Sequence, residues 1–265
     1  AEISQECQSR RRERRAWLLT WAEFAKMLDE VDLAILPVGV VEAHGPHLPL
    51  GTDFIIPERL ALDLASKLNA VVFPAIAYGV VGSLSSYFGT LGISQPTLES
   101  LIFEVLRGLV ENGLDRVVIL NGHGGSEHVE AIRKAVRRAW RELGIKSVVV
   151  HWWIYADSIA RKHGVGGGHA GGVEGAAVRA IDPGLVKSDS PDAREIYTVK
   201  EGIDPFPAPG SVLMYTEGES PAVPEEEVCR EFYMDLVDRL TEDLERVLEG
   251  WDNQEILPGE PFEEN

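Results

Sequence analysis

Cysteine is scarce in this chain of 265 residues, where only Cys7 and Cys229 occur, in no CxxC or CxxH arrangement. This scarcity argues against a disulfide framework and a thiolate zinc site. Apolar runs as long as the roughly 18 residues of a membrane-spanning helix are also missing, and the charged first twenty residues hold no apolar stretch typical of a secretion signal. We therefore expect a soluble protein of the reducing cytoplasm.

Basic residues are the second shortage, with 25 Lys and Arg against 43 Asp and Glu and a net charge of -18. Such a chain repels phosphate backbones and anionic lipid surfaces, so general nucleic-acid binding and membrane binding are not expected. The basic cluster Arg10 to Arg15 (RRRERR) is interpreted as a solvated tail or an intersubunit contact. A GxSxG elbow is also missing, which disfavours a Ser-His-Asp triad.

Short apolar runs alternate with stretches of helical period along the first part of the chain. The runs predict strands over Leu33–Val38, Ala70–Phe73, Arg116–Leu120 and Ser147–Trp152. The helical periods cover Trp21–Val31, Pro57–Leu68, Thr97–Glu111 and Ser126–Leu143, with Ser94 and Thr97 offering N-cap chemistry to the third. This alternation predicts an α/β fold of three layers, a mostly parallel sheet flanked by helices, which binds ligands beyond the carboxyl ends of its strands.

The later part of the chain has a different pattern. A glycine-rich segment, Gly164–Gly172, leads into a short helical run at Val173–Ile181. The polar stretch 182–224 is too long for an ordinary connection and predicts a functional flap or a subunit contact. A charged amphipathic helix over about 225–248 follows. No linker interrupts the chain, so we expect a single domain over 1–265, with a polar N-terminal segment (1–20) and an acidic tail (250–265).

The densest cluster of functional side chains, GVVEAHGPHLPLGTD at Gly39–Asp53, begins where the first predicted strand ends. Glu42 and His44 are two residues apart, so in extended backbone both point to the same side. Asp53 follows a turn rich in glycine and proline that could return a third ligand to that side. Nitrogen and oxygen ligands without sulfur suit zinc, manganese or iron(II).

Two further clusters lie in glycine-rich loops. His123 stands in NGHGG, directly after a predicted strand and before a long helix, which is the place of an active-site residue in an open α/β sheet. His169 and Glu174 stand in GGGHAGGVE, which could present an acid-base residue and a further carboxylate. An apolar core needs none of these groups, and burying them unpaired is costly. Together they predict a metal site.

The remaining histidines have simpler interpretations. His47 is read as a neighbour of the ligands or a substrate contact, because a ligand histidine normally needs an orienting partner. His128, His151 and His163 are expected to be merely hydrogen-bonded. Trp152 and Trp153 could stack on a flat heterocycle, and a core role for one of the two is an equal alternative.

The blocks LPVGVVEAHGPHLPLGTD, NGHGG and HAGGVE, in this order, resemble the signature of the creatininase (creatinine amidohydrolase) family over about Leu36 to Ala180. The resemblance implies a three-layer α/β fold, two divalent metal ions (zinc, iron(II) or manganese) and frequently a hexamer, so we expect a homo-oligomer. It places Glu42, His44, Asp53 and His123 at ligand positions, with Asp53 bridging both ions. His169 matches the proposed proton donor, and Glu174 matches the glutamate of the HAxxxE block.

The chain departs from this family pattern in two places. Creatinine-hydrolysing members carry a glutamate two positions after the histidine of NGH, where this chain has Gly125. One ion then needs another ligand, for which Glu174 is the candidate, and its choice between ligand and acid-base residue stays open. The loop Ser83–Thr90 reads SLSSYFGT in place of a histidine followed by FPGT. Both changes disfavour creatinine as the substrate.

We therefore expect a metal-dependent amidohydrolase that uses a metal-activated water to cleave a small formamide or cyclic amide, such as a formamidopyrimidine ribonucleotide. A phosphate on that substrate would need arginines such as Arg161 or Arg194. Hydrolysis of creatinine or of a modified peptide is an alternative, as is a sugar-ring carbon-carbon hydrolase. A catalytically silent, metal-binding assembly subunit is the alternative of another class.

Overall fold

The structure is a computed structural model and describes residues 13–253. Its central sheet has four parallel strands in the order β2-β1-β3-β4. The strands are β1 (Leu33–Val38), β2 (Ala70–Val72), β3 (Arg116–Asn121) and β4 (Lys146–His151). The predicted parallel sheet is confirmed. β1 has its predicted bounds, and the ends of the other strands differ from prediction by one residue.

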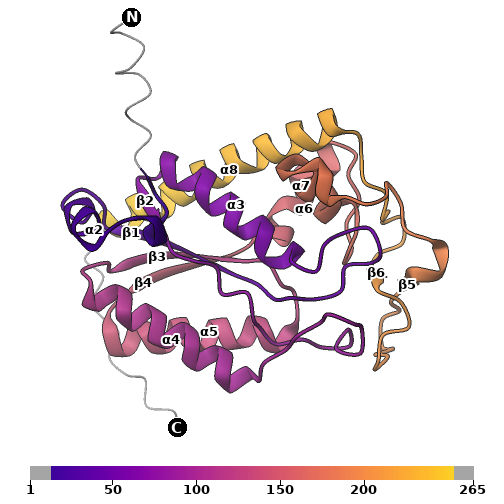
Figure 1. Ribbon diagram of the computed structural model, residues 1–265, viewed down its shortest axis with the longest axis horizontal. Coiled ribbons are helices and arrows are strands. Elements are labelled where there is room, and N and C mark those ends of the chain that lie inside the picture. Colours follow the sequence, from indigo (N-terminus) through magenta and orange to yellow (C-terminus); the bar gives the residue numbers. More distant parts are fainter. Residues whose placement is uncertain (1–12, 254–265) are drawn as a thin grey trace, which may run out of the picture.

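Helices cover both faces of the sheet and make the three layers that the sequence predicts (Figure 1). One face carries α3 (Thr52–Lys67), α6 (Trp152–Lys162), α7 (Gly172–Ile181) and α8 (Glu226–Asp252). The other carries α4 (Gln95–Glu111) and α5 (Ser126–Leu143), with α2 (Trp21–Met27) beside them. Within residues 13–253, none of these helices has the length and apolar character needed to cross a membrane.

The two hydrophobic cores follow from the alternation of side chains along the strands. In β1, Leu33 and Ile35 pack under α3 and α8, whereas Ala34 and Leu36 pack under α4 and α5. Successive side chains of a strand point to opposite faces, so a strand covered on both sides must be apolar throughout. Every residue of β1 is accordingly buried.

Helix starts follow local capping chemistry where the sequence offers it. Thr20 and Glu23 form a capping box at α2, which ends at Met27, four residues before the predicted Val31. The Ser94 side chain accepts a hydrogen bond from the Thr97 N–H and caps α4, as predicted, although the helix begins at Gln95. Short 3-10 helices lie at η1 (Ala16–Leu18), η2 (Pro183–Leu185) and η3 (Ala193–Glu195).

Two helices differ more strongly from the sequence-based expectation. α3 begins at Thr52, five residues before the predicted start at Pro57, which lies inside the helix. Trp152 does not end a strand but begins α6, which was not predicted. The run of aromatic and branched residues there is typical of a strand, and burial of Trp152 in the core decides for a helix.

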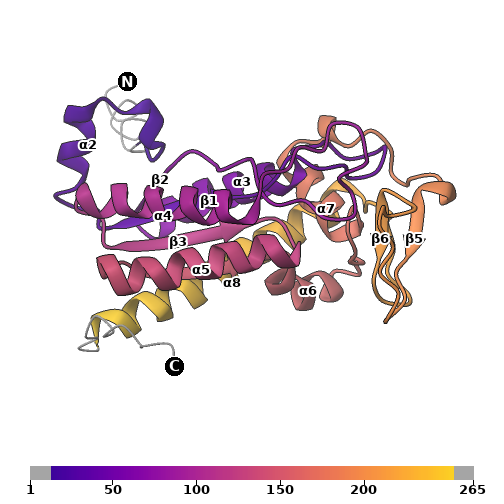
Figure 2. The ribbon, with the colours of Figure 1, turned by 90° about the horizontal axis from the view of Figure 1, so that it is seen from below.

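The stretch 182–224 contains a small parallel pair, β5 (Ile196–Thr198) and β6 (Val212–Met214), that was not predicted. Figure 2 shows this pair at the end of the molecule toward which the strands of the sheet run. β6 is tied to the glycine-rich loop, because Leu213 and His169 exchange backbone hydrogen bonds of 2.7 and 3.0 Å. The stretch therefore lies where ligands bind in such sheets, as expected of a functional flap.

Two glycines allow the first turn of α3 to lie against the ends of β1 and β3. A Cβ atom at Gly39 would stand 2.1 Å from the carbonyl oxygen of Asp53, and one at Gly122 would stand 1.8 Å from the same oxygen. Pro57, four residues after Asp53, has no N–H to donate to this carbonyl, as a helix would otherwise require. The close approach fixes Asp53 at the carboxyl edge of the sheet.

We predict that Gly122→Ala lowers the free energy of unfolding by at least about 1–3 kcal/mol, because the new methyl group overlaps backbone that cannot move away. Gly108→Ala is the matched control. A Cβ atom there meets nothing within 4 Å, and alanine in a helix gains up to about 1 kcal/mol. Urea denaturation of both variants measures the difference. Equal stability of the two variants would contradict the close approach.

Candidate metal centre

Six side chains that the sequence analysis singled out converge at the carboxyl edge of the sheet. Glu42 and His44 follow β1, Asp53 lies in the first turn of α3, and His123 follows β3. His169 ends the glycine-rich loop, and Glu174 lies in the first turn of α7. All are buried except His169, which is partly buried. The structure thus brings together every residue proposed for the site.

The carboxylate of Asp53 lies between two histidines. Its Oδ1 is 2.9 Å from Nε2 of His44, and its Oδ2 is 2.9 Å from Nδ1 of His123. Asp53 is shared by two groups of potential ligands whose atoms lie within 4.8 Å of one another, namely Glu42, Asp53 and His123, and His44, Asp53 and Glu174. A carboxylate shared in this way has the geometry to bridge two cations.

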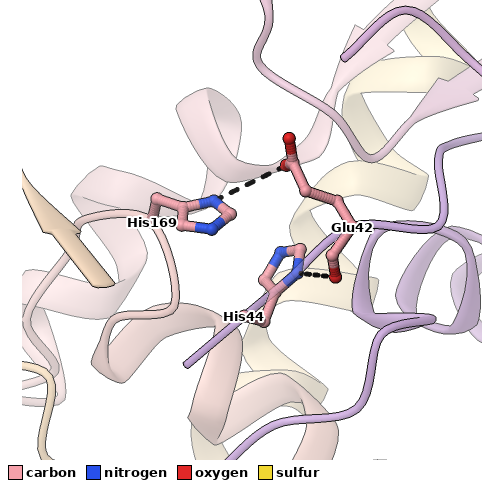
Figure 3. Close-up of side chains that lie close together, drawn as sticks. All are labelled: Glu42, His44 and His169. Atoms are coloured by element: carbon pink, nitrogen blue, oxygen red, sulfur yellow. Dashed lines mark hydrogen bonds and ion pairs between the residues drawn. The ribbon is translucent and has the colours of Figure 1, made fainter. Parts of the chain in front are cut away.

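Backbone carbonyls orient two of the imidazoles. Nδ1 of His44 lies 3.0 Å from the carbonyl oxygen of Glu42 and donates its proton there, which leaves Nε2 facing the site (Figure 3). Nε2 of His169 lies 2.8 Å from the carbonyl oxygen of Ala43. Its Nδ1 therefore faces the carboxylate of Glu42 at 4.0 Å, also seen in Figure 3. Each ring presents one defined nitrogen to the site.

The site concentrates negative charge in the interior. Burial opposes protonation of His44, but Asp53 and Glu174 outweigh it and raise the pKa of His44 to about 10. His123 behaves alike, because Glu42 and Asp53 overcome burial and raise its pKa to about 10. Conversely, both imidazoliums outweigh burial and hold the pKa of Asp53 well below its usual range. Two protonated histidines thus compensate part of the charge of the carboxylates.

Glu174 lies with His44 and Asp53 in the second group of potential ligands. Its Oε2 lies 3.7 Å from Nε2 of His44 and accepts a 2.6 Å hydrogen bond from the N–H of Ala170. Burial raises the pKa of Glu174 to about 7. Gly125 lines the cavity and faces Nε2 of His123, where a Cβ atom would come within 2.6 Å.

The donor set fits divalent cations. Oε2 of Glu42 is buried and makes no hydrogen bond to any residue of the described range. Three carboxylates meet there, and no lysine or arginine side chain of the described residues pairs with them. Buried carboxylates need such compensation, and cations held by oxygen and nitrogen atoms supply it.

A cavity of about 520 Å³ opens above these residues. Besides the candidate ligands, its walls contain Ser83, Leu84, Trp153, Ile154, Asp157, Leu213, Tyr215 and Glu219. Trp153 is thus the tryptophan available to a substrate, whereas Trp152 is fully buried in the core. Among the described residues, no lysine or arginine lines the cavity.

The other histidines have structural surroundings. The His128 ring lies 3.1 Å from Oδ1 of Asn121, whose side chain bonds both the N–H and the carbonyl of His123. His151 contacts the same amide at 3.0 Å, and His163 pairs with Asp235. The hydrogen bonding expected for His128, His151 and His163 is therefore present.

His47 is fully buried, and both of its ring nitrogens lack hydrogen bonds to the described residues. Its ring packs beneath Gly45, where a Cβ atom would stand 2.7 Å from Nδ1, and it is not among the residues that line the cavity. Of its two expected roles, the structure favours a neighbour of the ligand loop over a substrate contact.

Sequence reasoning did not single out several residues of the cavity wall. Asp157 comes from the unpredicted α6, while Leu213, Tyr215 and Glu219 come from β6 and the turn after it. No motif marks these positions. The only local signal is the short apolar run VLM at Val212–Met214 within a polar segment.

Comparison with known proteins places this geometry in a family. The family model described as creatininase, creatinine amidohydrolase, matches residues 17–243. A mycofactocin precursor peptide peptidase of Mycobacterium ulcerans is 34% identical over 167 residues, which are 58% of this chain and 60% of the relative. A creatinine amidohydrolase of Pseudomonas putida is 31% identical over 153 residues, 54% of this chain and 58% of the relative.

The matched segments thus span less than two thirds of the length of these curated relatives. The similarity in fold covers a larger share of both chains than the similarity in sequence. A solved structure named "Creatininase Mn" superposes with a TM-score of 0.73 at 25% sequence identity, covering 89% of this chain and 99% of that one. Because the family model covers most of the sequence, the chain belongs to the creatininase family.

Proposed function

We propose that this protein is a metal-dependent amidohydrolase that cleaves a C–N bond in a small amide without a negatively charged substituent. The observation that carries the proposal is the position of Asp53, which both ligand groups share on the floor of the cavity. Family membership and the names of the two curated relatives, both hydrolytic, support it.

Of three overlapping groups of potential ligands, we assign metal binding to the two that share Asp53 and leave His169, which lies with Glu42 and His44 in the third, for proton transfer. Glu42, Asp53 and His123 would hold one divalent ion, and His44, Asp53 and Glu174 would hold the second. Zinc, manganese and iron(II) suit such a set, and the name of one similar solved structure, "Creatininase Mn", includes manganese. When bound, the ions activate a water molecule and polarise the amide oxygen.

His169 is placed to move the proton. Burial and the neighbouring His44 lower the pKa of His169 to about 4, so its ring is neutral near pH 7. Because Nε2 donates to the Ala43 carbonyl, the free lone pair is on Nδ1, which faces the site. We assign to Nδ1 the uptake of a proton from the attacking water and its delivery to the leaving nitrogen.

The walls of the cavity favour neutral or positively charged substrates. Asp157 and Glu219 line it, and no lysine or arginine of residues 13–253 does. Arg161 and Arg194, the arginines considered for a substrate phosphate, are paired with Asp157 and Asp192 and lie outside the lining. A formamide or cyclic amide is therefore favoured over its phosphorylated form.

A second candidate is hydrolysis of an amide near the end of a modified peptide. It is supported by the 34% identity to a peptide peptidase and by a cavity of about 520 Å³, within the range of pockets that hold ligands larger than a single small ring. Both candidate reactions use the same metal-binding residues. They differ in the part of the substrate that the cavity walls contact.

The shared position of Asp53 predicts a graded loss of metal. We expect Asp53→Asn to lose both ions, whereas His123→Ala and Glu174→Gln each lose one, because each removes a ligand from only one group. Elemental analysis of the purified variants measures the stoichiometry. His163→Ala, which changes a histidine paired with Asp235 outside the site, is the control and should keep both ions. Unaltered metal content in Asp53→Asn would rule out the centre.

Activity should depend on the ions. Treatment with a chelator should abolish turnover, and adding back zinc, manganese or iron(II) should restore it in the parent chain but not in His123→Ala. Mutation of ligands or their partners commonly costs about 10–100-fold or more. Ions bound without any turnover would instead support a silent metal-binding subunit.

Substrate charge gives a separate test. A formamidopyrimidine nucleoside should be deformylated with a kcat/KM at least about tenfold above that of its 5′-monophosphate, because the acidic walls repel the phosphate. Creatinine, formanilide and short peptides complete the panel, with release of amine or formate as the measurement. Preference for the monophosphate would show that the substrate class is wrong, although the hydrolase would stand.

A further inference from the structure

We propose that Tyr215 is a catalytic residue of this site, whose phenolic O–H donates a hydrogen bond to the amide oxygen as negative charge develops there. The inference rests on the proposed hydrolase function and deepens it. It gives the stretch 182–224 a direct part in the reaction, in addition to closing the side of the cavity.

The register of β6 directs Tyr215 into the cavity. Leu213 is held to His169 by two backbone hydrogen bonds, so this strand is fixed relative to the proposed proton carrier. Leu213 and Tyr215 both line the cavity, whereas Met214 between them is buried in the core. This is the alternation of an extended chain, in which residues two apart share a side.

The backbone of Tyr215 is held on its other side by Glu219. One carboxylate oxygen of Glu219 accepts hydrogen bonds from the N–H of Tyr215 at 2.6 Å and of Thr216 at 3.0 Å. The turn after β6 is therefore closed by a charge-assisted pair of hydrogen bonds. The backbone of Tyr215 is anchored in this way, while its side chain is 58% exposed.

The hydroxyl of Tyr215 has no partner among the described residues. The hydroxyls of Tyr87, Tyr155 and Tyr233 donate to protein oxygens at 3.1, 2.7 and 2.9 Å. Tyr215 has no such bond, and it shares the cavity wall with Glu42, Asp53 and Glu174. A tyrosine that faces reactive groups with its donor free can use that donor on a bound molecule.

Its charge state fits a donor. Partial desolvation in the cavity, with Glu174 and Glu42 adding to it, raises the pKa of Tyr215 to about 12, so the phenol keeps its proton near pH 7. In the hydrolysis, the water oxygen bonds to the amide carbon, the C–N bond breaks, and the leaving nitrogen takes the proton carried by His169. Tyr215 keeps its own proton throughout.

The test is Tyr215→Phe, which removes the hydroxyl and retains the ring. It is assayed with whichever compound of the panel (creatinine, formanilide, formamidopyrimidine nucleoside, short peptides) the parent chain turns over fastest. Loss of one donor to a developing oxyanion lowers kcat by about 10²–10³-fold, and we expect a fall of this order with KM within about threefold. Metal content and melting temperature should match the parent chain. Tyr78→Phe, an exposed tyrosine outside the cavity lining, is the control and should retain full kcat.

Each other outcome overturns the proposal in a recognisable way. A kcat within about twofold of the parent, or a rise in KM alone, shows that Tyr215 does not act in the transition state, and the hydrolase function stands. A fall in kcat accompanied by lost metal or a lower melting temperature shows a structural role. If the parent chain with its full metal content turns over no member of the panel, the proposed function fails and this inference fails with it.

Discussion

The position of Asp53 depends on a contact between backbones, and much of the site depends on Asp53. Its carbonyl group occupies space that a Cβ atom at Gly39 or Gly122 would fill, so the first turn of α3 lies directly on the ends of β1 and β3. The helix is thus held by contact between its backbone and the backbone of the sheet, and not by a contact through a flexible side chain. With its backbone held there, the carboxylate of Asp53 reaches a histidine from the loop after each of these strands.

This placement has an electrostatic consequence for the whole edge of the sheet. Three carboxylates and two ligand histidines are buried together, and the carboxylates raise the pKa values of His44 and His123 to about 10, so both imidazoles carry a compensating proton. Divalent ions that displace these protons would bind in competition with them. Glu219 adds a further carboxylate on the wall, where no lysine or arginine of the described residues stands, so one charge distribution favours both cation binding and a substrate without phosphate.

The sequence predicted those parts of the molecule that local patterns determine. Strands buried on both faces are apolar throughout, and β1 lies at its predicted bounds. Glu42, His44 and His123 stand in loops that follow strands, so topology alone brings them to one edge. The other three site residues are brought there by α3, by the loop after α6 and by α7. Local patterns failed for α6, where Trp152 and its neighbours read as a strand, and for β5 and β6, whose pairing joins residues that are 16 positions apart. The cavity wall at Tyr215 depends on that pairing, so no motif could reveal it.

The structure therefore separates the site into a floor and a wall of different origin. The floor consists of the ends of β1 and β3 and the first turns of α3 and α7, where the glycine contacts restrict change. The wall on the other side comes from α6 and the stretch after β6, and β6 is joined to the loop of His169 by the pairing of Leu213 with His169. Exposed turns of this kind accept substitution more readily than backbone contacts at a sheet edge. Positions of the wall other than Tyr215 can thus change with the substrate while the chemistry is kept. The pairing of β6 with His169 holds the proposed proton carrier and Tyr215 at the same cavity.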